Sequence, residues 1–340
     1  MAALDDLAAL VRDDGVVLGA APAAPYAAAE TAIRDRRARG LFADMRFTMQ
    51  QPERSCHPET ALRGARTVVS ALIEVWEPEP PRPPGAVGRL PRYAWGDPYA
   101  RLRTALARVR DALRGDGARA AVFVDHNMHV DRAGGHAAGL TFSGKNTMAI
   151  APGLGSFVAL GAVITDAALV DEAPLAVRDG CGSCTLCIDA CPTDALHEPG
   201  VLDATKCLAY WTQTPGEMPD DVMDGLDDRV YGCDICQDVC PWNRGVEKRR
   251  AGGPLGDDAQ PVVSLEDWLT RDGRELVDDL ERLYVPRNDP RWLRRNALVA
   301  LGNVGRPGDE RHVEPALDDP DEAVRAAAAR AATRIAERSG

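Results

Sequence analysis

The sequence predicts a multidomain protein of the α+β or α/β class, with an α/β front domain, a cysteine-rich middle and a helical end. In the first half, apolar runs rich in β-branched residues alternate with helical patterns. Eight of the nine cysteines lie between Cys181 and Cys240, and a helical pattern led by Asp-Pro occurs twice near the end. The 340 residues exceed the usual size of a domain with one core, so we expect three domains, over residues 1–175, 176–250 and 251–340.

The front domain is expected to be built in layers of helix and sheet. Residues 98–114 place leucine and valine on one face and arginine on the others, which is the pattern of a surface helix. The proline-rich stretch 78–85 interrupts regular structure. The predicted elements are a helix over residues 4–11, a strand over 65–75, a helix over 98–114 and a strand over 120–125.

One uncharged stretch, residues 147–165, is about long enough to span a bilayer. Its Pro152, Gly153, Gly155 and Gly161 instead favour a strand, a turn and a second strand in a buried core. The first residues of the chain are acidic and amphipathic, unlike an export signal. We therefore expect a cytoplasmic protein without a membrane segment.

Four cysteines of the middle region, Cys181, Cys184, Cys187 and Cys191, follow the spacing C-x2-C-x2-C-x3-C-P of bacterial ferredoxins. In two-cluster ferredoxins the first three thiolates bind one cluster and the fourth crosses to the other. Cysteines in a cytoplasmic protein are more often metal ligands than disulfides, because that compartment keeps thiols reduced. The spacing therefore predicts a ferredoxin-like domain with two clusters.

A second set of cysteines completes the pair, because Cys233, Cys236 and Cys240 repeat the motif one cysteine short and Cys207 lies upstream. The predicted ligands are Cys181, Cys184, Cys187 and Cys240 for the first [4Fe-4S] cluster, and Cys191, Cys207, Cys233 and Cys236 for the second. Two structural zinc sites are the alternative, although a dense run ending in Cys-Pro suits a single tetrahedral ion poorly. The isolated Cys56 is expected to be a small buried side chain.

The end of the chain contains a repeat. The pattern of residues 289–302 recurs at 319–332, a period of thirty residues, and each copy begins with Asp-Pro. Proline is favoured at the first position of a helix, and small residues along each copy allow close packing. The pattern resembles HEAT-like helical repeats.

The front domain lacks the common nucleotide motifs, since no G-x-G-x-x-G follows a strand and no G-x-x-x-x-G-K-[ST] is present. Asp125 ends an apolar strand, where a desolvated carboxyl group can donate a proton; its alternative role is a helix N-cap. Asp131 is expected to be structural. His126, His129 and His136 have no clear carboxylate partner, so loop or surface histidines are favoured over a metal site.

The order of several motifs resembles the epoxyqueuosine reductases, a family of iron–sulfur and cobalamin enzymes of tRNA modification. The motifs are Y-A-W-G, V-D-H-N-M-H-V-D-R, G-K-N-T, the first cysteine run, Y-G-C-D-I-C-Q-D-V-C-P-W-N and R-N-A-L-V-A-L-G-N, and the resemblance extends from about Arg54 to the HEAT-like end. The block at residues 231–243 is the most specific of them.

The resemblance implies reduction of epoxyqueuosine to queuosine at the wobble position of a tRNA anticodon. Electrons would pass through two [4Fe-4S] clusters to base-off cobalamin held by the front domain, and Asp125 would donate a proton. The implied cobalamin contacts are Arg54, Tyr93, Asp125, Lys145, Asn146, Thr147 and Ser156. A flavodoxin or ferredoxin system would supply the electrons, and we expect a monomer.

A tRNA substrate requires basic residues, although the formal net charge is −12. Residues 243–250 and 286–295 are rich in arginine. The predicted tRNA contacts are Arg244, Lys248, Arg249, Arg250, Arg294 and Arg295. Solvated helix ends are the alternative interpretation of each.

Three departures from the family's pattern line the predicted active site. His126-Asn127-Met128 stands where the family often has Thr-Gly-Pro, Phe142-Ser143 where it often has Trp-x before Gly-Lys, and Ala100 where it often has His. Two other functions therefore stay open, a cobalamin-dependent reductase of another substrate, as in reductive dehalogenases, and a non-enzymatic iron–sulfur electron carrier. Reductive dehalogenases typically carry export signals and lack such repeats, and a carrier would leave the front domain without a role.

Overall fold

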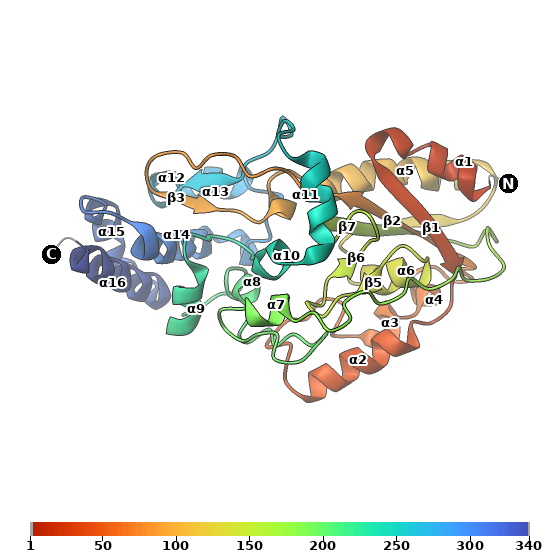
Figure 1. Ribbon diagram of the computed structural model, residues 1–340, viewed down its shortest axis with the longest axis horizontal. Coiled ribbons are helices and arrows are strands. Elements are labelled where there is room, and N and C mark those ends of the chain that lie inside the picture. Colours follow the sequence, from red (N-terminus) through yellow and green to blue (C-terminus); the bar gives the residue numbers. More distant parts are fainter. Residues whose placement is uncertain (1–2, 339–340) are drawn as a thin grey trace.

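The computed structural model describes residues 3–338. Its strands are β1 Val16–Pro22, β2 Thr67–Glu74, β3 Val87–Arg89, β4 Ala120–Phe123, β5 Phe142–Ser143, β6 Ala149–Ile150, β7 Val158–Thr165 and β8 Val262–Ser264. Its α-helices are α1 Leu4–Ala9, α2 Ala27–Ala38, α3 Pro52–Ser55, α4 Pro58–Ala61, α5 Pro98–Gly115, α6 Asp131–Ala137, α7 Leu186–Asp189, α8 Leu208–Trp211, α9 Asp220–Leu226, α10 Ile235–Asp238, α11 Arg244–Arg250, α12 Leu265–Thr270, α13 Gly273–Asp278, α14 Arg291–Val304, α15 Glu310–Val313 and α16 Glu322–Glu337. The molecule is elongated, with the sheet at one end, α14 to α16 at the other and the cysteine-rich segment between them (Figure 1).

The front part is built on one sheet in the order β1-β2-β7-β4, in which every neighbouring pair is antiparallel. Of the two expected classes, α+β therefore describes this sheet. The strands predicted over residues 65–75 and 120–125 are confirmed as β2 and β4, with small differences at their ends. Strands β2 and β7 are buried along nearly their whole length, because helices cover both faces of the sheet (Figure 1).

Helix α5 covers one face, as its apolar pattern predicts. Leu102, Leu106, Val109 and Leu113 are all fully buried and share a core with alternate residues of β2. On the other face the sheet packs against α6, and this contact is close. A Cβ atom at Gly134 would lie 2.7 Å from His129 Nε2 and 3.0 Å from Ser70 Oγ of β2. The residues before and within α6 are therefore held firmly against the sheet.

The uncharged stretch 147–165 forms β6, a turn and β7, as predicted. Among residues 3–338, no helix has the length and apolar composition that crossing a membrane requires.

The C-terminal helices share their core with earlier parts of the chain. Helices α14 and α16 pack together, and their buried residues belong to one cluster with Leu90, Trp95, Leu208 and Tyr231. Strand β3 also pairs with β8 across this region. The core thus crosses the expected boundary at residue 250, because the repeat helices use the front and middle segments as packing partners.

The predicted proline positions of these helices differ slightly from the structure. Pro290 is the N-cap residue of α14, one position before its first residue, and Pro320 lies outside α16. Asp321 caps α16 instead, its carboxylate accepting from the Ala323 N–H at 3.0 Å. The HEAT-like character of the pair stays a prediction.

Candidate metal centres and active site

The first predicted set of thiols surrounds one cavity. Cys181, Cys184, Cys187 and Cys240 all line a cavity of about 110 Å³, together with Lys145, Asn146, Ile150, Gly180, Pro241 and Trp242. The cavity therefore combines cysteines from the first run with the last cysteine of the second set. This is the combination that the ferredoxin crossing rule requires.

Neighbouring residues hold the loop of this first set in place. The Lys145 ammonium group donates to the carbonyl oxygens of Gly182 at 2.7 Å and Cys184 at 3.0 Å, and the Lys145 backbone N–H points at Cys181 Sγ at 3.4 Å. Trp242 Nε1 donates to the Gly180 carbonyl oxygen at 3.3 Å. A backbone N–H directed at a ligand sulfur is a feature that stabilises negatively charged clusters.

The second predicted set is also drawn together, and the electrostatic coupling of its thiols shows this. Burial raises the pKa of Cys233 to about 12, and the charge of Cys207 raises it further. Burial also raises the pKa of Cys236 well above its usual range, followed by the charges of Cys233, Cys207 and, across the two sets, Cys187. Cys207 in turn is affected by Cys191. The second set therefore adjoins the first.

These thiols fit clusters better than single ions. Within residues 3–338, no three His, Cys, Asp or Glu side chains converge on a point suitable for one metal ion. The thiols of the first set instead stand around a cavity. Thiolates arranged around a volume can each bind a different iron of a cubane cluster. Burial raises the pKa of Cys187 and Cys240, so cluster binding must release the protons of these thiols.

Asp125 lies two residues after the end of β4, in a left-handed backbone conformation with φ of +50°, and it is exposed. Burial by the surrounding protein nevertheless raises the pKa of its carboxyl group, and the charge of Arg103 partly offsets this. The alternative role of Asp125 as a helix N-cap is wrong, because α6 begins at Asp131 and its N-cap residue is Val130. The structure thus presents an accessible carboxyl group that retains its proton to higher pH than usual.

Asp131 is the neighbour of Asp125. Burial raises the pKa of Asp131 well above its usual range, and the charge of Asp125 raises it further. His129 is also buried beside it, with 4.0 Å between His129 Nε2 and Asp131 Oδ1, and burial lowers the His129 pKa to about 4. His129 is therefore a neutral, buried histidine in the loop before α6, which agrees with the loop alternative and excludes a surface position.

Further side chains around Asp125 were missed by sequence reasoning. Burial raises the pKa of Tyr99, with the charges of Asp125 and Asp131 next in effect. Arg132 interacts electrostatically with Tyr99 and Asp131 and also with Cys236. Arg132 therefore lies between two neighbours of Asp125, Tyr99 and Asp131, and one predicted ligand of the second cluster, Cys236. Tertiary packing alone brings Tyr99 to this site, whereas Arg132 ends the motif V-D-H-N-M-H-V-D-R, which did not by itself indicate its partners.

Two of the implied cobalamin contacts have buried side chains. Asn146 Nδ2 donates to the Cys236 carbonyl oxygen at 3.2 Å, and Ser156 Oγ donates to Gln237 Oε1 at 3.0 Å. Both side chains are buried, with 2% and 4% of their surface exposed. They join the front domain to the cysteine segment, and Asn146 also lines the cavity of the first cysteine set. The contact between these two segments also requires glycine at position 155, because a Cβ atom there would lie 2.1 Å from Asn243 Oδ1.

The other implied cobalamin contacts lie in varied places. Tyr93 is partly exposed, and burial followed by the charge of Tyr231 raises its pKa. Thr147 is partly exposed, and its carbonyl oxygen accepts from Arg132 Nη1 at 3.0 Å. The Lys145 ammonium group is engaged by the first cysteine loop. Arg54 is exposed on α3, where its Nη1 donates to Gln51 Oε1 at 3.0 Å.

The predicted tRNA contact at Arg295 is wrong. Arg295 has only 1% of its surface exposed, and its guanidinium donates to the carbonyl oxygens of Thr214, Gly216 and Trp211 at 2.6–2.8 Å. Burial lowers its pKa to about 10. Arg295 therefore supports the segment between the two cysteine sets and cannot contact a phosphate group.

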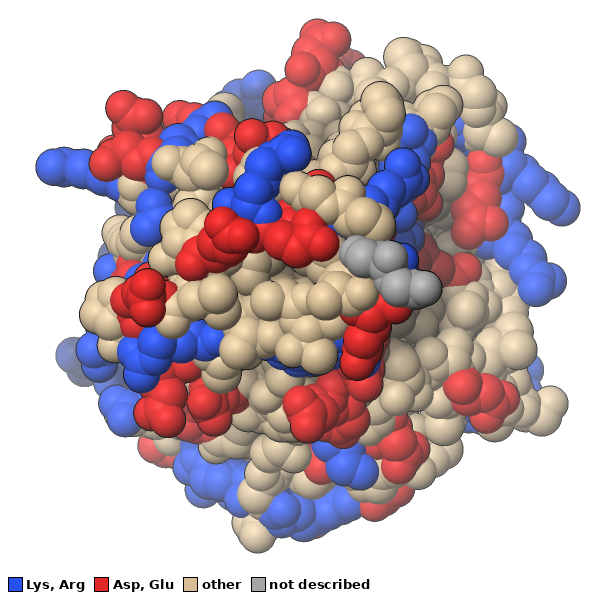
Figure 2. All heavy atoms as spheres, turned by 90° about the vertical axis from the view of Figure 1, so that its left-hand side faces the viewer, with Lys and Arg blue, Asp and Glu red and all other residues tan. Residues whose placement is uncertain are grey.

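The remaining predicted tRNA contacts are more accessible. Arg244, Lys248, Arg249 and Arg250 are exposed on α11, and Arg249 lies 3.3 Å from Glu74. Arg294 is half-buried. On the end of the molecule formed by the C-terminal helices, acidic and basic side chains are interspersed (Figure 2). The charged face of α11 is thus the more concentrated basic segment of the two that were predicted.

Comparison with known proteins agrees with this geometry. Residues 180–243 match the 4Fe-4S double cluster binding domain family. The epoxyqueuosine reductase of Lactococcus garvieae is 32% identical over 280 residues, covering 80% of this chain and 78% of the relative. That of Bacillus anthracis is 32% identical over 295 residues, covering 83% and 76%.

Solved structures extend the similarity to nearly the whole chain. Epoxyqueuosine reductase with a tRNA-Tyr epoxyqueuosine-modified stem loop has a TM-score of 0.87 at 29% identity, covering 97% of this chain and 89% of that one. The enzyme from Streptococcus thermophilus has a TM-score of 0.86 at 26% identity, covering 98% and 90%.

Proposed function

This chain belongs to the epoxyqueuosine reductase family, and on that premise we propose that it reduces epoxyqueuosine in tRNA to queuosine, with two [4Fe-4S] clusters and cobalamin as its redox groups. The observation that carries the proposal is the position of Asp125, an accessible carboxyl group of raised pKa whose charge acts on Tyr99. Tyr99 in turn interacts with Arg132, which also interacts with Cys236 of the second cysteine set. An electron carrier would not need such an acid. The family relationship likewise favours epoxyqueuosine over other substrates of cobalamin-dependent reductases.

The reaction requires protons as well as electrons. Converting the epoxide to an alkene removes its oxygen as water, which consumes two electrons and two protons. The raised pKa of Asp125 keeps a proton on its carboxyl group to higher pH than an ordinary aspartate does, and this proton can be transferred to the epoxide oxygen as the C–O bond breaks. Burial raises the pKa of the neighbouring Asp131 well above its usual range, so this group resists ionisation and limits the negative charge around the acid.

The residues around Asp125 fit a polar cofactor such as cobalamin. When bound, cobalamin would supply the low-potential electrons for cleaving the epoxide C–O bond. Asp131 Oδ1 is buried and has no hydrogen-bond partner among residues 3–338, so it can accept from a carboxamide of the corrin ring. Tyr93 and Thr147 are partly exposed beside this region, and we propose them as direct contacts. Arg54 stays a proposed contact, whereas Lys145 supports the first cluster loop.

The tRNA would approach from the accessible side of Asp125. Arg103 and Arg132 are exposed and both influence the groups at this site, so we add them to α11 as proposed phosphate contacts. Arg294 stays a weaker proposal, because its Nη2 already donates to the Arg271 carbonyl oxygen at 2.9 Å. A flavodoxin or ferredoxin donor, the monomeric state and the cytoplasmic location also stay predictions.

Anaerobic reconstitution tests the cofactors directly. The purified chain, supplied with iron, sulfide and cobalamin, should bind two clusters and show the EPR signal of base-off Co(II). A chain that takes up no corrinoid contradicts the cobalamin assignment. The tRNA assignment is tested in cells: a strain lacking the gene should accumulate epoxyqueuosine in tRNA, and a strain without a redundant enzyme that still makes queuosine would contradict it.

A further inference from the structure

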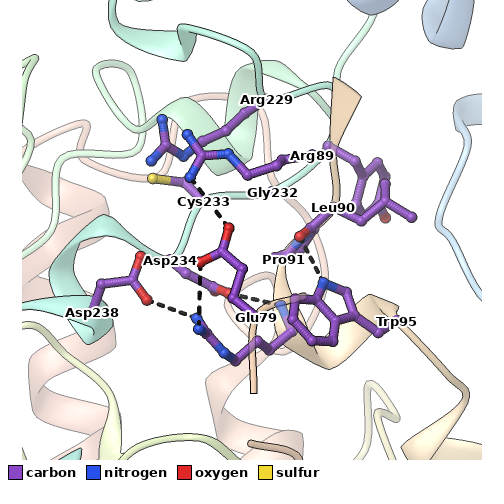
Figure 3. A pocket seen from close by; sticks show the side chains of 12 residues that line it. Glu79, Arg89, Leu90, Pro91, Trp95, Arg229, Gly232, Cys233, Asp234 and Asp238 are labelled. Carbon is purple, nitrogen blue, oxygen red and sulfur yellow. Dashed lines mark hydrogen bonds and ion pairs between the residues drawn. The ribbon is translucent and has the colours of Figure 1, made fainter. Parts of the chain in front are cut away.

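A small cavity borders the second cysteine set. Cys233 lines it together with Glu79, Arg89, Leu90, Pro91, Arg92, Trp95, Arg229, Tyr231, Gly232, Asp234 and Asp238 (Figure 3). Its volume of about 30 Å³ has room for about one water molecule, so no organic ligand fits. The charged side chains that line the cavity therefore lie close to Cys233, a predicted ligand of the second cluster.

Two of the three arginines around this cavity are paired with carboxylates. Arg89 lies 2.7 Å from the buried Asp228, and Arg92 Nη1 donates to Asp238 Oδ1 at 2.8 Å. The Arg92 backbone N–H also donates to Asp234 Oδ2 at 2.7 Å, and its guanidinium stacks over the rings of three aromatic side chains. The charges of Arg89 and Arg92 are thus largely balanced where they stand.

Arg229 differs from the other two. Among residues 3–338 it is the one arginine of this cavity without an ion pair, and its Nη1 has a weak 3.4 Å bond to the Leu226 carbonyl oxygen. It stands near Cys233 at the same end of the cavity (Figure 3). Arg229, Cys233, Asp234 and Asp238 line the same cavity, and among residues 3–338 neither aspartate lies within ion-pair distance of Arg229. This half-buried arginine therefore brings a positive charge to the cavity that Cys233 lines, without an ion pair of its own among residues 3–338.

We propose that Arg229 raises the reduction potential of the second [4Fe-4S] cluster through its charge beside Cys233. Reduction adds one electron, and hence one negative charge, to the cluster and its thiolates. A positive charge close by in a poorly hydrated region stabilises the reduced state more than the oxidised state. Arg229 thereby makes the second cluster easier to reduce by a low-potential donor.

The effect of the Arg229 charge on the second cluster is tested by a potentiometric titration of the full, anaerobically reconstituted chain with dithionite, followed by low-temperature EPR. Arg229→Gln should shift the midpoint potential of the second cluster to a more negative value and leave that of the first nearly unchanged. Arg229→Lys, which keeps the charge, should stay close to the wild-type value. The wave that belongs to the second cluster is identified as the one lost in Cys191→Ala.

A second variant, expected to shift the midpoint potential in the opposite direction, makes the test independent of folding defects in Arg229→Gln. Asp238→Asn removes a negative charge from the same cavity and should shift the second midpoint to a less negative value. Arg274→Gln, on exposed α13, is the matched control and should shift neither midpoint. An unchanged second midpoint in Arg229→Gln, an equal shift in Arg229→Lys, or an unchanged or more negative midpoint in Asp238→Asn overturns the proposal. None of these measurements uses tRNA, so they are independent of the proposed reaction.

Discussion

The backbone N–H of Ser156 donates to Asn243 Oδ1 at 2.7 Å, and this bond joins the loop before β7 to the segment after the last cysteine. Asn243 is fully buried, and its Nδ2 also donates to the Gln237 carbonyl oxygen at 2.7 Å. One side chain therefore holds the front domain, the α10 turn and the cysteine segment together. The relative position of the active site and the clusters depends on such contacts.

Asn243→Ala should lower the melting temperature of the reconstituted protein. It leaves the Ser156 N–H without its partner in a buried place, which destabilises a protein by roughly 1–3 kcal/mol. Thermal unfolding followed by circular dichroism under anaerobic conditions measures the effect. Asn127→Ala, at an exposed position, is the control and should unfold at nearly the wild-type temperature. Equal melting temperatures for Asn243→Ala and the wild type contradict the role of Asn243 in this contact.

Arg103→Gln should move the pH dependence of the reaction. Asp125 is active when protonated, so the rate should fall as pH rises through its raised pKa. The positive charge of Arg103 lowers this pKa, and its removal should shift the falling limb to higher pH. Single-turnover rates across a pH series measure the shift. Arg101→Gln, exposed on the same helix, should leave the limb in place; a shift to lower pH in Arg103→Gln is the contrary result.

Asp131→Asn should change how stability depends on pH. Because the folded protein raises the pKa of Asp131, it binds this proton more tightly than the unfolded chain does. The contribution of Asp131 to stability is therefore complete below its unfolded pKa of about 4 and is lost as pH rises through the folded pKa. Asn mimics the neutral acid, so the variant should be at least as stable at neutral pH.

Denaturant unfolding at several pH values measures this difference. The stability of the wild type relative to Asp131→Asn should fall as pH rises. Asp171→Asn, at an exposed position, should follow the wild type throughout. If the difference in free energy of unfolding between the wild type and Asp131→Asn does not change with pH, the raised pKa of Asp131 is contradicted.

Much of this arrangement is predictable from the sequence, and the exceptions have physical reasons. The four leucine and valine positions of α5 are buried as its periodicity predicts, because one apolar face can pack on a sheet without knowledge of the rest. The first cysteine cavity follows from spacing, since the loop itself brings three thiols together. The charged residues are harder. Arginine is usually a surface residue, so the sequence suggests exposure for Arg295. Its burial depends on carbonyl oxygens of a segment distant in sequence, to which its guanidinium group donates.

The residues around Asp125 show the same limit. Tyr99 and Arg132 come from separate helices, α5 and α6, and Tyr99 comes close to Asp125 and Arg132 only through tertiary packing. Asn146 and Ser156 belong to a conspicuous Gly-rich loop, which sequence reasoning connects to a cofactor. In the structure, the cysteine segment itself occupies the close approach at that loop. Sequence patterns identify the residue types of a site, whereas the partner of each polar group depends on tertiary contacts.

The crossing of ligands between the two clusters is a further prediction. Cys191→Ala should remove the second cluster and spare most of the first, because Cys191 is electrostatically coupled to Cys207 while the first cavity is lined by four other cysteines. Iron analysis and EPR of the reduced protein distinguish the clusters. Cys56→Ala, outside both sets, should retain the full iron content. Loss of the first cluster in Cys191→Ala, with the second intact, means that the two ligand sets must be exchanged.

The most direct measurement is the conversion of an epoxyqueuosine-modified tRNA stem loop by the reconstituted chain under a strong reductant, followed by mass spectrometry of the nucleosides. The wild-type protein should convert epoxyqueuosine to queuosine only when both clusters and cobalamin are present. Asp125→Asn should bind the same cofactors yet lose nearly all of the conversion, while Asp171→Asn retains it. Conversion by Asp125→Asn at the wild-type rate, or none by the fully loaded wild-type protein, contradicts the account.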